Sequence, residues 1–279
     1  MIPESEYSNP EVPHEVNVSE RTPVRDFLRL SIGLGLIVAI VAGVVFFTAR
    51  FWAPHIPFRY EENLTDFNFK EEGRNPCAAA GERSLQALAD DLAAKMALPA
   101  GMSVRIHFIN SDEPNALATL GGNIAVSRGL VENVHSENAL AMVLAHEIGH
   151  IKHRDPIVSL GGGVAMALIF SALLGDSNDG TFATGIIGMT QMSFSRGQEE
   201  RADREALLAV QARYGHTDGA DEFFDYILHE HPKMSRLPTF VRTHPSLQSR
   251  LDAIRATFTS NQHPLQPLPE SIQQLRLCQ

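Results

Sequence analysis

Two histidines four positions apart, with a glutamate directly after the first, are the residues most able to do chemistry: His146, Glu147 and His150. On an α-helix, residues with this spacing share a face and differ in height by about one turn, so both imidazoles can bind one zinc ion. Glu147 then lies beside the coordination position left open for water, where hydrolysis needs a base. The pattern predicts a zinc hydrolase, with a metalloprotease as the favoured kind.

The segment around this motif has the features of a helix. Ser136 or Asn138 can cap its N-terminus, and Pro156 prevents its continuation beyond Asp155. The apolar residues between these limits can form a buried face. The alternative is an ordinary helix that carries two histidines by chance, and the rest of the chain must exclude it.

A zinc site of this kind needs a third protein ligand, and residues 195–203 are the best place to find it. Ser195 and Gln198 match a capping box, which predicts a helix that continues to about residue 213. On such a helix Glu199 shares a face with small residues, whereas Glu200 does not. Glu199 is therefore the predicted third ligand. The alternative is a solvated helix of mixed charge.

One turn beyond Glu199, Asp203 could orient a ligating imidazole from behind. We expect the remaining histidines to have no role at the metal. They are His14, His55, His107, His135, His153, His216, His229, His231 and His263. His153 follows His150 by three residues, but the charged residues beside it indicate a solvated helix end.

Composition limits the class of protein. The formal net charge of −10, without a basic cluster, argues against a nucleic-acid partner. Cys77 and Cys278 are too isolated for a thiolate metal site. They either form a disulfide, which requires an oxidising compartment, or are two unrelated thiols.

The N-terminal part of the chain predicts a membrane anchor. Residues 1–26 are polar and are expected to form a disordered tail. The stretch Leu30–Ala49 has no charge and is long enough to cross a hydrocarbon core of ~30 Å, so residues 27–50 are predicted to be a single transmembrane helix. Arginines are slightly more numerous before this stretch than after it, which favours a cytoplasmic N-terminus. The bulk of the chain is then expected on the periplasmic side of a bacterial inner membrane.

The pattern of the remaining chain predicts an α+β fold. A linker over residues 51–75 is expected to lead into a domain over residues 76–260, followed by a tail over residues 261–279. A helix is predicted over residues 84–96 and strands near 104–110, 116–120 and 123–126, before the His-Glu-x-x-His helix. Short strands followed by helices predict a mainly helical domain with a small sheet beside the active-site helix.

A second apolar stretch begins at Pro156 and continues to Gly175. Its apolar return, residues 181–194, spans only ~20 Å as a helix, which is short of a full crossing. We therefore expect residues 156–195 to form a buried or membrane-dipping hairpin rather than two further spans.

Four motifs in order give the chain a resemblance to a known family. They are Asn115-Ala116 with Gly121-Gly122 and Val126; the His-Glu-x-x-His motif; Ser195-Arg196 followed by Glu199-x-x-Ala202-Asp203; and Thr243-His244-Pro245 with Arg250. Together they resemble the metallopeptidases that include the heat-shock protease HtpX, the CAAX prenyl endopeptidases and Oma-type mitochondrial proteases. The resemblance covers about residues 80–258. Arg201, at a position that is often acidic or aromatic in the family, is a departure that touches no ligand.

The resemblance implies a zincin-like fold and one Zn²⁺ per chain. His146, His150 and Glu199 would bind it, Glu147 would be the catalytic base, and Asp203 would support the ligands, as would Arg250. His244 would lie near the open zinc position, where family members use a histidine to stabilise an oxyanion or to block the metal. The segment Asn115–Val126, with Ala116, Gly121 and Gly122, would form the edge strand that binds an extended substrate.

These expectations combine into a membrane-anchored zinc endopeptidase that acts on unfolded or misfolded envelope or membrane proteins. The alternative from another class is a latent or non-cleaving, zinc-bound, chaperone-like module, against which the intact Glu147 argues. A deformylase-type hydrolase would need a cysteine ligand, and neither Cys77 nor Cys278 has a suitable context. A simple anchor or scaffold protein would leave the motifs unexplained.

Overall fold

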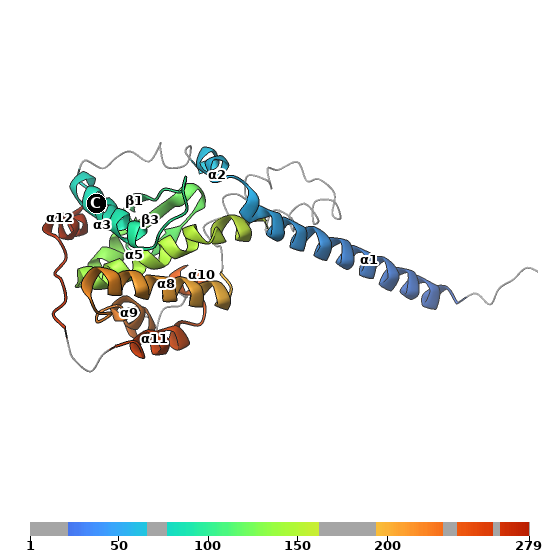
Figure 1. The fold of residues 1–279 in the computed structure, drawn as a ribbon. Helices are drawn as coiled ribbons and strands as arrows, with labels where there is room; N and C mark the ends of the chain where they lie inside the picture. The colour runs from blue at the N-terminus through green and yellow to red at the C-terminus, as the bar shows by residue number, and fades with distance from the viewer. Residues whose placement is uncertain (1–21, 66–76, 162–193, 231–238, 259–262, 279) are drawn as a thin grey trace, which may run out of the picture. The chain divides into compact units, whose positions relative to one another are not determined.

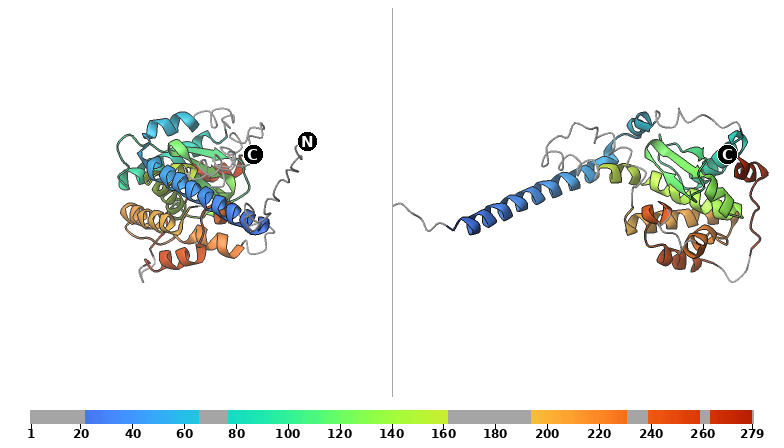
Figure 2. Two further views of the ribbon diagram at one scale, coloured as in Figure 1. Left: turned by 90° about the vertical axis from the view of Figure 1, so that its right-hand side faces the viewer. Right: turned by 180° about the vertical axis from the view of Figure 1, so that it is seen from behind.

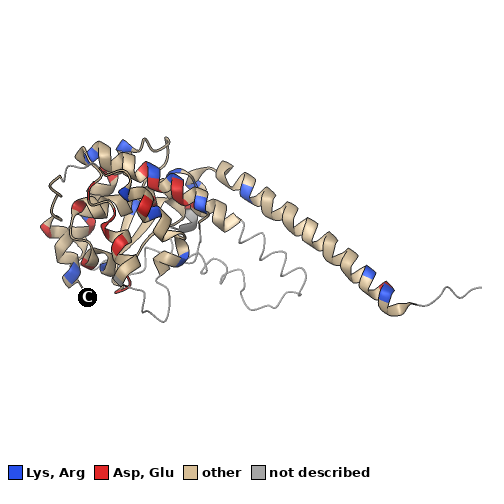
Figure 3. Cartoon of the chain, turned by 90° about the horizontal axis from the view of Figure 1, so that it is seen from below, with Lys and Arg blue, Asp and Glu red and all other residues tan. Residues whose placement is uncertain are grey.

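The computed structural model describes residues 22–65, 77–161, 194–230, 239–258 and 263–278, and it divides into two compact units at Val44 and Val45. Helix α1 (Pro23–Trp52) supplies the described part of the first unit and continues into the second. It is long and apolar enough to cross a membrane, and its middle carries no charged residue (Figure 3). None of its residues is buried. This agrees with the predicted anchor, except that the helix starts before residue 27.

The second unit contains a mixed three-stranded sheet. Its strands are β1 (Arg105–Ile109), β2 (Ala116–Ala118) and β3 (Asn123–Ser127), in the order β1-β3-β2. β3 is parallel to β1 and antiparallel to β2. The turn η2 (Leu120–Gly122) joins β2 to β3, with both glycines at positive φ. Among the described residues β2 pairs with one strand, so its other edge can pair with an extended chain outside the sheet.

Helices enclose this sheet (Figure 1). Helix α5 (Glu137–Lys152) carries the histidine motif and lies between the sheet and a layer of helices from the C-terminal half of the chain, as the two further views also show (Figure 2). The helices of this unit include α3 (Ala79–Lys95), α4 (Arg128–Asn133), α5 (Glu137–Lys152), α8 (Arg196–Tyr214), α9 (Glu222–Glu230), α10 (Thr239–Thr243) and α11 (Leu247–Arg255). The predicted α+β class, mainly helical with a small sheet, is confirmed.

Helix α5 is the centre of the core, and its side chains from Asn138 to Ile151 are all buried. Ser136 caps it by accepting a hydrogen bond from the amide of Ala139 at 3.1 Å. It ends at Lys152 rather than at Asp155, because Arg154 adopts a left-handed backbone conformation with φ of 61°. The charged side chains of such a buried helix need partners from the surrounding protein, because water cannot reach them.

Helices α5 and α8 approach closely where small residues face each other. A Cβ atom added to Gly149 would lie 3.1 Å from the Cα atom of Ala202. The absence of a side chain at Gly149 therefore lets the two helices bring their functional groups to one point.

The residues expected to form the linker and the tail contribute to the folded unit, which corrects both expectations. In the linker, α2 (Phe58–Thr65) buries Phe58 and Glu61 against η2. In the tail, Leu268, Ile272 in α12 (Glu270–Gln273) and Leu275 in the turn η4 (Gln274–Leu277) are buried in the main core. Their spacing of three and four residues is the apolar stripe of a helix, which we had not recognised.

The C-terminal segment (residues 263–278) also decides between the two alternatives for the cysteines: Cys77 and Cys278 form a disulfide with their Cα atoms 5.6 Å apart. Of the expected hairpin over residues 156–195, the structure describes 156–161, which are helical, and 194–195. The rest of that prediction lies outside the described residues.

Candidate metal centre

Helix α5 places His146, Glu147 and His150 at one buried point. Each of the three side chains is 0% exposed. The Nε2 atoms of His146 and His150 face each other at 3.1 Å, as expected for histidines one helical turn apart. The helical context that the motif requires is therefore present.

Helix α8 brings Glu199 to the same point. The capping box of Ser195 and Gln198 is formed, and the helix starts at Arg196, next to the predicted position. The Glu199 carboxylate lies 3.5 Å from Nε2 of His146 and 3.6 Å from Nε2 of His150, whereas Glu200 is exposed. Glu199, the predicted ligand, thus faces the histidines, and Glu200 faces solvent.

His244, which directly follows α10, adds a fourth potential ligand. Its Nδ1 atom lies 3.2 Å from Nε2 of His146 and 3.1 Å from Oε1 of Glu199. One ligand atom from each of His146, His150, Glu199 and His244 lies within 4.8 Å of all the others. The structure therefore gathers donors from α5, α8 and the residue after α10 around one position.

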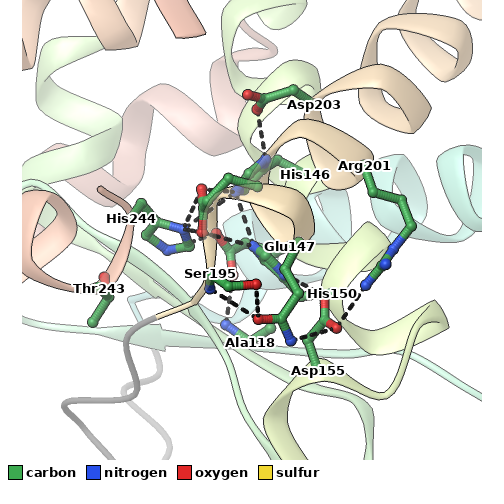
Figure 4. Close-up of polar contacts among 12 residues, drawn as sticks. Ala118, His146, Glu147, His150, Asp155, Ser195, Arg201, Asp203, Thr243 and His244 are labelled. Carbon is green, nitrogen blue, oxygen red and sulfur yellow. Dashed lines mark hydrogen bonds and ion pairs between the residues drawn. The ribbon is translucent and has the colours of Figure 1, made fainter. Parts of the chain in front are cut away.

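Two carboxylates fix how the α5 imidazoles are oriented (Figure 4). Nδ1 of His146 contacts Asp203 at 2.9 Å, and Nδ1 of His150 contacts Asp155 at 2.9 Å. With Nδ1 donating to a carboxylate, Nε2 of each neutral ring keeps a lone pair. The two Nε2 lone pairs and the Glu199 carboxylate then converge in a buried space. These electron-rich groups repel one another unless a cation lies between them. The donor set fits a divalent metal, and its nitrogen and oxygen chemistry suits zinc.

Asp155 was missed by the sequence analysis as a supporting residue. It is 2% exposed and accepts hydrogen bonds from Gln198 at 2.8 Å and Arg201 at 2.9 Å. Arg201, the departure from the family pattern, thus stabilises the carboxylate that orients His150. An acidic residue shortly after the second histidine was the available signal.

Arg250 on α11 balances the negative charge of the site. Its guanidinium contacts both oxygens of Asp203 at 2.7 Å and Oε2 of Glu199 at 2.5 Å. Burial disfavours both carboxylates in their charged form. Arg250 outweighs this at Asp203 and lowers the pKa of its carboxyl, and His244 with His146 does the same for Glu199. Both carboxylates are therefore ionised at neutral pH.

Glu147 is held by the edge strand. Its Oε2 atom accepts a hydrogen bond from the amide of Ala118 at 2.7 Å, and Oε1 is buried without a hydrogen-bond partner among the described residues. Burial raises the pKa of Glu147 to about 7, although His146 beside it acts in the opposite direction. The free Oε1 atom lies 3.5 Å from Nε2 of His244, which likewise has no hydrogen bond within the described structure.

The expected substrate-binding segment Asn115–Val126 is not one edge strand. Within this segment β2 lies at one edge of the sheet, while Val126 belongs to the central strand β3 and cannot pair with a substrate. Asn115 and Thr119 bond to β3, so the backbone groups of Ala116 and Ala118 point to the free edge. Asn115 keeps a buried Oδ1 atom without a partner among the described residues.

Gly121 and Gly122 have a structural position in η2. The amide of Gly121 donates to Glu61 at 3.1 Å, and a Cβ atom on Gly122 would lie 1.9 Å from the carbonyl oxygen of Ser103. The hydrogen bond holds the turn between β2 and β3, and the second distance shows that no side chain fits at Gly122. These glycines shape the edge strand without lying on it.

Two phenylalanines that we had not predicted line the histidines. Phe194 stacks on His150 with ring centres 3.9 Å apart, and Phe240 stacks on His244 at 4.6 Å. The amide of Phe194 donates to the carbonyl of Thr243 at 3.0 Å, which joins the two segments. Burial lowers the pKa of His244 to about 3, against the pull of Glu199, so its ring is neutral and can act as a ligand.

Most other histidines have partners away from the metal centre. His153 contacts Glu205 at 2.6 Å, His107 contacts Asn123 at 2.8 Å and His135 contacts Glu222 at 2.9 Å. His216 and His263 differ from the expectation, because the structure brings them together beside Asp218. They are separated by a long stretch of sequence, so no local spacing could have indicated this.

Comparison with known proteins agrees with the motifs. Residues 79–258 match the model of the group described as Peptidase family M48. The chain is 31% identical over 161 residues to a "Beta-barrel assembly-enhancing protease" of Escherichia coli, which covers 52% of this chain and 33% of the relative. It is also similar to two proteins named "Protease HtpX homolog". The one from Methylibium petroleiphilum is 30% identical over 195 residues, covering 62% of this chain and 63% of the relative. The one from Acidiphilium cryptum is 35% identical over 159 residues, covering 48% and 53%.

Proposed function

The chain belongs to peptidase family M48, and from this membership we propose that it is a membrane-anchored zinc endopeptidase. The observation that carries the proposal is the convergence of His146, His150 and Glu199 next to a buried Glu147 with one unpaired oxygen. The chain matches about a third to two thirds of the length of its relatives, so activity and substrate are inferred from its own residues.

His146, His150 and Glu199 would hold the zinc ion, with Asp203 and Asp155 fixing the two imidazoles. When bound, zinc supplies Lewis acidity toward water and toward the scissile carbonyl. Glu147 uses Oε1 to take a proton from the attacking water and later delivers it to the leaving amine. The Ala118 amide keeps Oε2 in place, so the reactive oxygen is the other one.

His244 can serve in two ways. Its Nε2 atom lies beside Oε1 of Glu147 and can donate a hydrogen bond to the developing oxyanion. Its Nδ1 atom lies among the ligand atoms, and this favours a second candidate function: a latent or non-cleaving state in which the imidazole occupies the open metal position. We propose the catalytic role for the active enzyme and the ligand role for a resting form.

The free edge of β2 supports a substrate that binds in extended form. Ala116 offers its backbone groups there and Ala118 its carbonyl, while the amide of Ala118 holds Glu147 directly beside them. Pairing with a strand edge recognises the main chain more than a specific sequence, and therefore selects unfolded segments. Misfolded envelope or membrane proteins are the substrates we propose. The name of the Escherichia coli relative, which refers to β-barrel assembly, supports this class.

The location we propose is a single-pass anchor in a bacterial inner membrane with the second unit in the periplasm. Helix α1 supplies the span. The Cys77–Cys278 disulfide supports the periplasmic side, because such bonds persist in oxidising compartments.

The test combines metal analysis with cleavage of an unfolded protein by the full chain in detergent. Wild type is expected to retain zinc in the centre and to cleave. Glu147→Gln should keep the metal and lose cleavage by ~10²-fold or more, because the proton acceptor is gone. Glu199→Ala should lose the metal, whereas Glu200→Ala on the exposed side of the same helix should not. Full cleavage by Glu147→Gln, or an unchanged metal content in Glu199→Ala, would overturn the proposed roles.

Cleavage that appears only in His244→Ala would support the resting form. Metal without cleavage in both wild type and His244→Ala would favour the non-cleaving module.

A further inference from the structure

A second cluster of potential metal ligands lies where α8 ends. It consists of His216 and Asp218, which follow the helix, and His263, which begins the C-terminal segment. One ligand atom from each lies within 4.8 Å of the other two. None of these residues belongs to the catalytic centre described above.

Two glycines in left-handed conformations shape the loop that carries His216 and Asp218. Gly215 ends α8 with φ of 80°, and Gly219 closes the loop with φ of 86°. Asp218 binds the first residue of the C-terminal segment: its Oδ2 atom accepts hydrogen bonds from the backbone amide of His263 at 2.9 Å and from its Nδ1 at 2.8 Å. The carboxylate is thereby directed at both imidazoles.

His216 supplies an independent observation. It is only 8% exposed, and its Nδ1 atom has no hydrogen-bond partner among the described residues. That atom lies 4.0 Å from Oδ2 of Asp218, too far for a hydrogen bond. A buried imidazole nitrogen with no partner is costly, and it faces a carboxylate across a gap.

We propose that His216, Asp218 and His263 bind a divalent transition-metal ion, zinc being the expected one. Two imidazole nitrogens and one carboxylate are ligands that zinc accepts, with a fourth position for water. The potential ligand atoms lie within 4.8 Å of one another, so a side-chain rotation can bring them to the ~3.4 Å expected between donors ~2.1 Å from a tetrahedral ion. The ion would supply the missing partner of His216 Nδ1.

One ring must turn for both imidazoles to point at one ion. The rings of His216 and His263 are stacked, with centres 4.6 Å apart and planes 8° from parallel. His216 is buried, but the side chain of His263 is 38% exposed and can rotate. The metal would thus convert a stacked pair into a chelate.

The ion would join the loop after α8 to the C-terminal segment. That segment lies against the start of α5: the amide of Glu137 donates to the carbonyl of Gln266 at 2.8 Å, and Asn138 accepts from the amide of Gln266 at 2.9 Å. The inferred role is therefore structural. The ion would fasten one end of the segment, as the disulfide at Cys278 fastens the other.

The experiment counts metal in the full chain in detergent. The protein is stripped with a chelator, equilibrated with Zn²⁺, freed of unbound ion and analysed for zinc per chain. We expect two equivalents for wild type and one for His263→Ala and for Asp218→Asn. The matched control His229→Ala, an exposed histidine on α9, should keep two. The second equivalent should raise the melting temperature of wild type but not of His263→Ala.

Several outcomes would overturn the proposal: one equivalent in wild type that is lost in Glu199→Ala, or two equivalents retained in both His263→Ala and Asp218→Asn. His216→Ala alters a buried position and can prevent folding. In that case the test rests on His263→Ala, because the side chain of His263 is partly exposed. The catalytic centre is tested separately. If wild type binds one equivalent that is lost in His263→Ala and kept in Glu199→Ala, the second site stands and the proposed catalytic centre fails.

Discussion

At the scale of single residues, the candidate centre depends on how two imidazoles are oriented. Asp203 and Asp155 each engage an Nδ1 atom, which leaves both Nε2 atoms free for a metal. Arg250 binds Asp203 and Glu199 together, so a buried cluster of carboxylates keeps its charge. The ligands are thus prepared before any ion enters, because their supporting contacts are made by the protein itself.

Removing the charge of one supporting carboxylate should weaken the binding of the metal. Asp203→Asn would lose the ionic contact to Arg250 and the strong acceptor of His146 Nδ1. We expect a loss of ~10–100-fold in zinc affinity, measured by competition with a chelator. Asp252→Asn on the exposed side of α11 is the matched control and should leave the affinity unchanged. Equal affinities of Asp203→Asn and wild type would show that His146 needs no carboxylate.

The pH dependence of cleavage should follow Glu147. Its pKa is raised to about 7 by burial, and a nearby divalent cation would lower it. A general base works only when ionised, so kcat/KM should fall as the pH drops through this pKa, at pH 7 or below. The measurement is kcat/KM from about pH 5 to about pH 8 with zinc saturating. A rate that rises steadily on acidification would exclude Glu147 as the base.

At the scale of elements, the centre exists where α5 and α8 touch. The histidines come from one helix and Glu199 from the other, and Gly149 against Ala202 sets how near they lie. The sheet contributes through β2, whose edge amide at Ala118 fixes Glu147. Helix contact and strand edge together position the base and the ligands relative to a bound main chain.

A larger side chain at Gly149 should separate the helices. Gly149→Val is expected to destabilise the protein by ~1–3 kcal/mol through overpacking, and to weaken zinc binding as Glu199 moves away. Gly197→Ala is the control on α8, since a Cβ atom there meets nothing within 4 Å. Stability is measured by denaturant unfolding and metal content by analysis. Normal zinc content in a folded Gly149→Val would mean that the helix contact does not set the ligand geometry.

At the scale of the whole molecule, the C-terminal segment closes the second unit. Leu268, Ile272 and Leu275 enter the same core as α5, and Arg276 donates to the carbonyls of Val131 and Val134 at 3.0 Å and 2.9 Å. The disulfide then links this segment to the residues before α3 across a sequence separation of 201. The last residues of the chain therefore stabilise the helix that carries the histidines.

Breaking this link should cost stability. A loop of this length corresponds to about 5 kcal/mol in the chain-entropy model, and native disulfides typically contribute 2–5 kcal/mol. Cys77→Ala/Cys278→Ala should lower the free energy of unfolding by about that amount, measured by denaturant unfolding without reductant. Wild type with reductant should behave like the double variant, and the double variant should be insensitive to reductant. Identical free energies of unfolding for wild type and variant would show that the disulfide does not stabilise the fold.

The sequence by itself determined the features whose signal is local. The histidine motif, the capping box that precedes Glu199 and the uncharged stretch of α1 each follow from the spacing of neighbouring residues. Helical periodicity also distinguished Glu199 from Glu200, because it decides which carboxylate shares a face with small residues.

Only the tertiary structure decided the features that depend on contacts between distant segments. It placed Asp155 behind His150, put Val126 in the middle of the sheet, buried the expected linker and tail, and joined His216 to His263. Side chains far apart in sequence meet only through the packing of the helices and strands between them. No local spacing encodes which of many possible partners a charged or apolar side chain will find once the chain is folded.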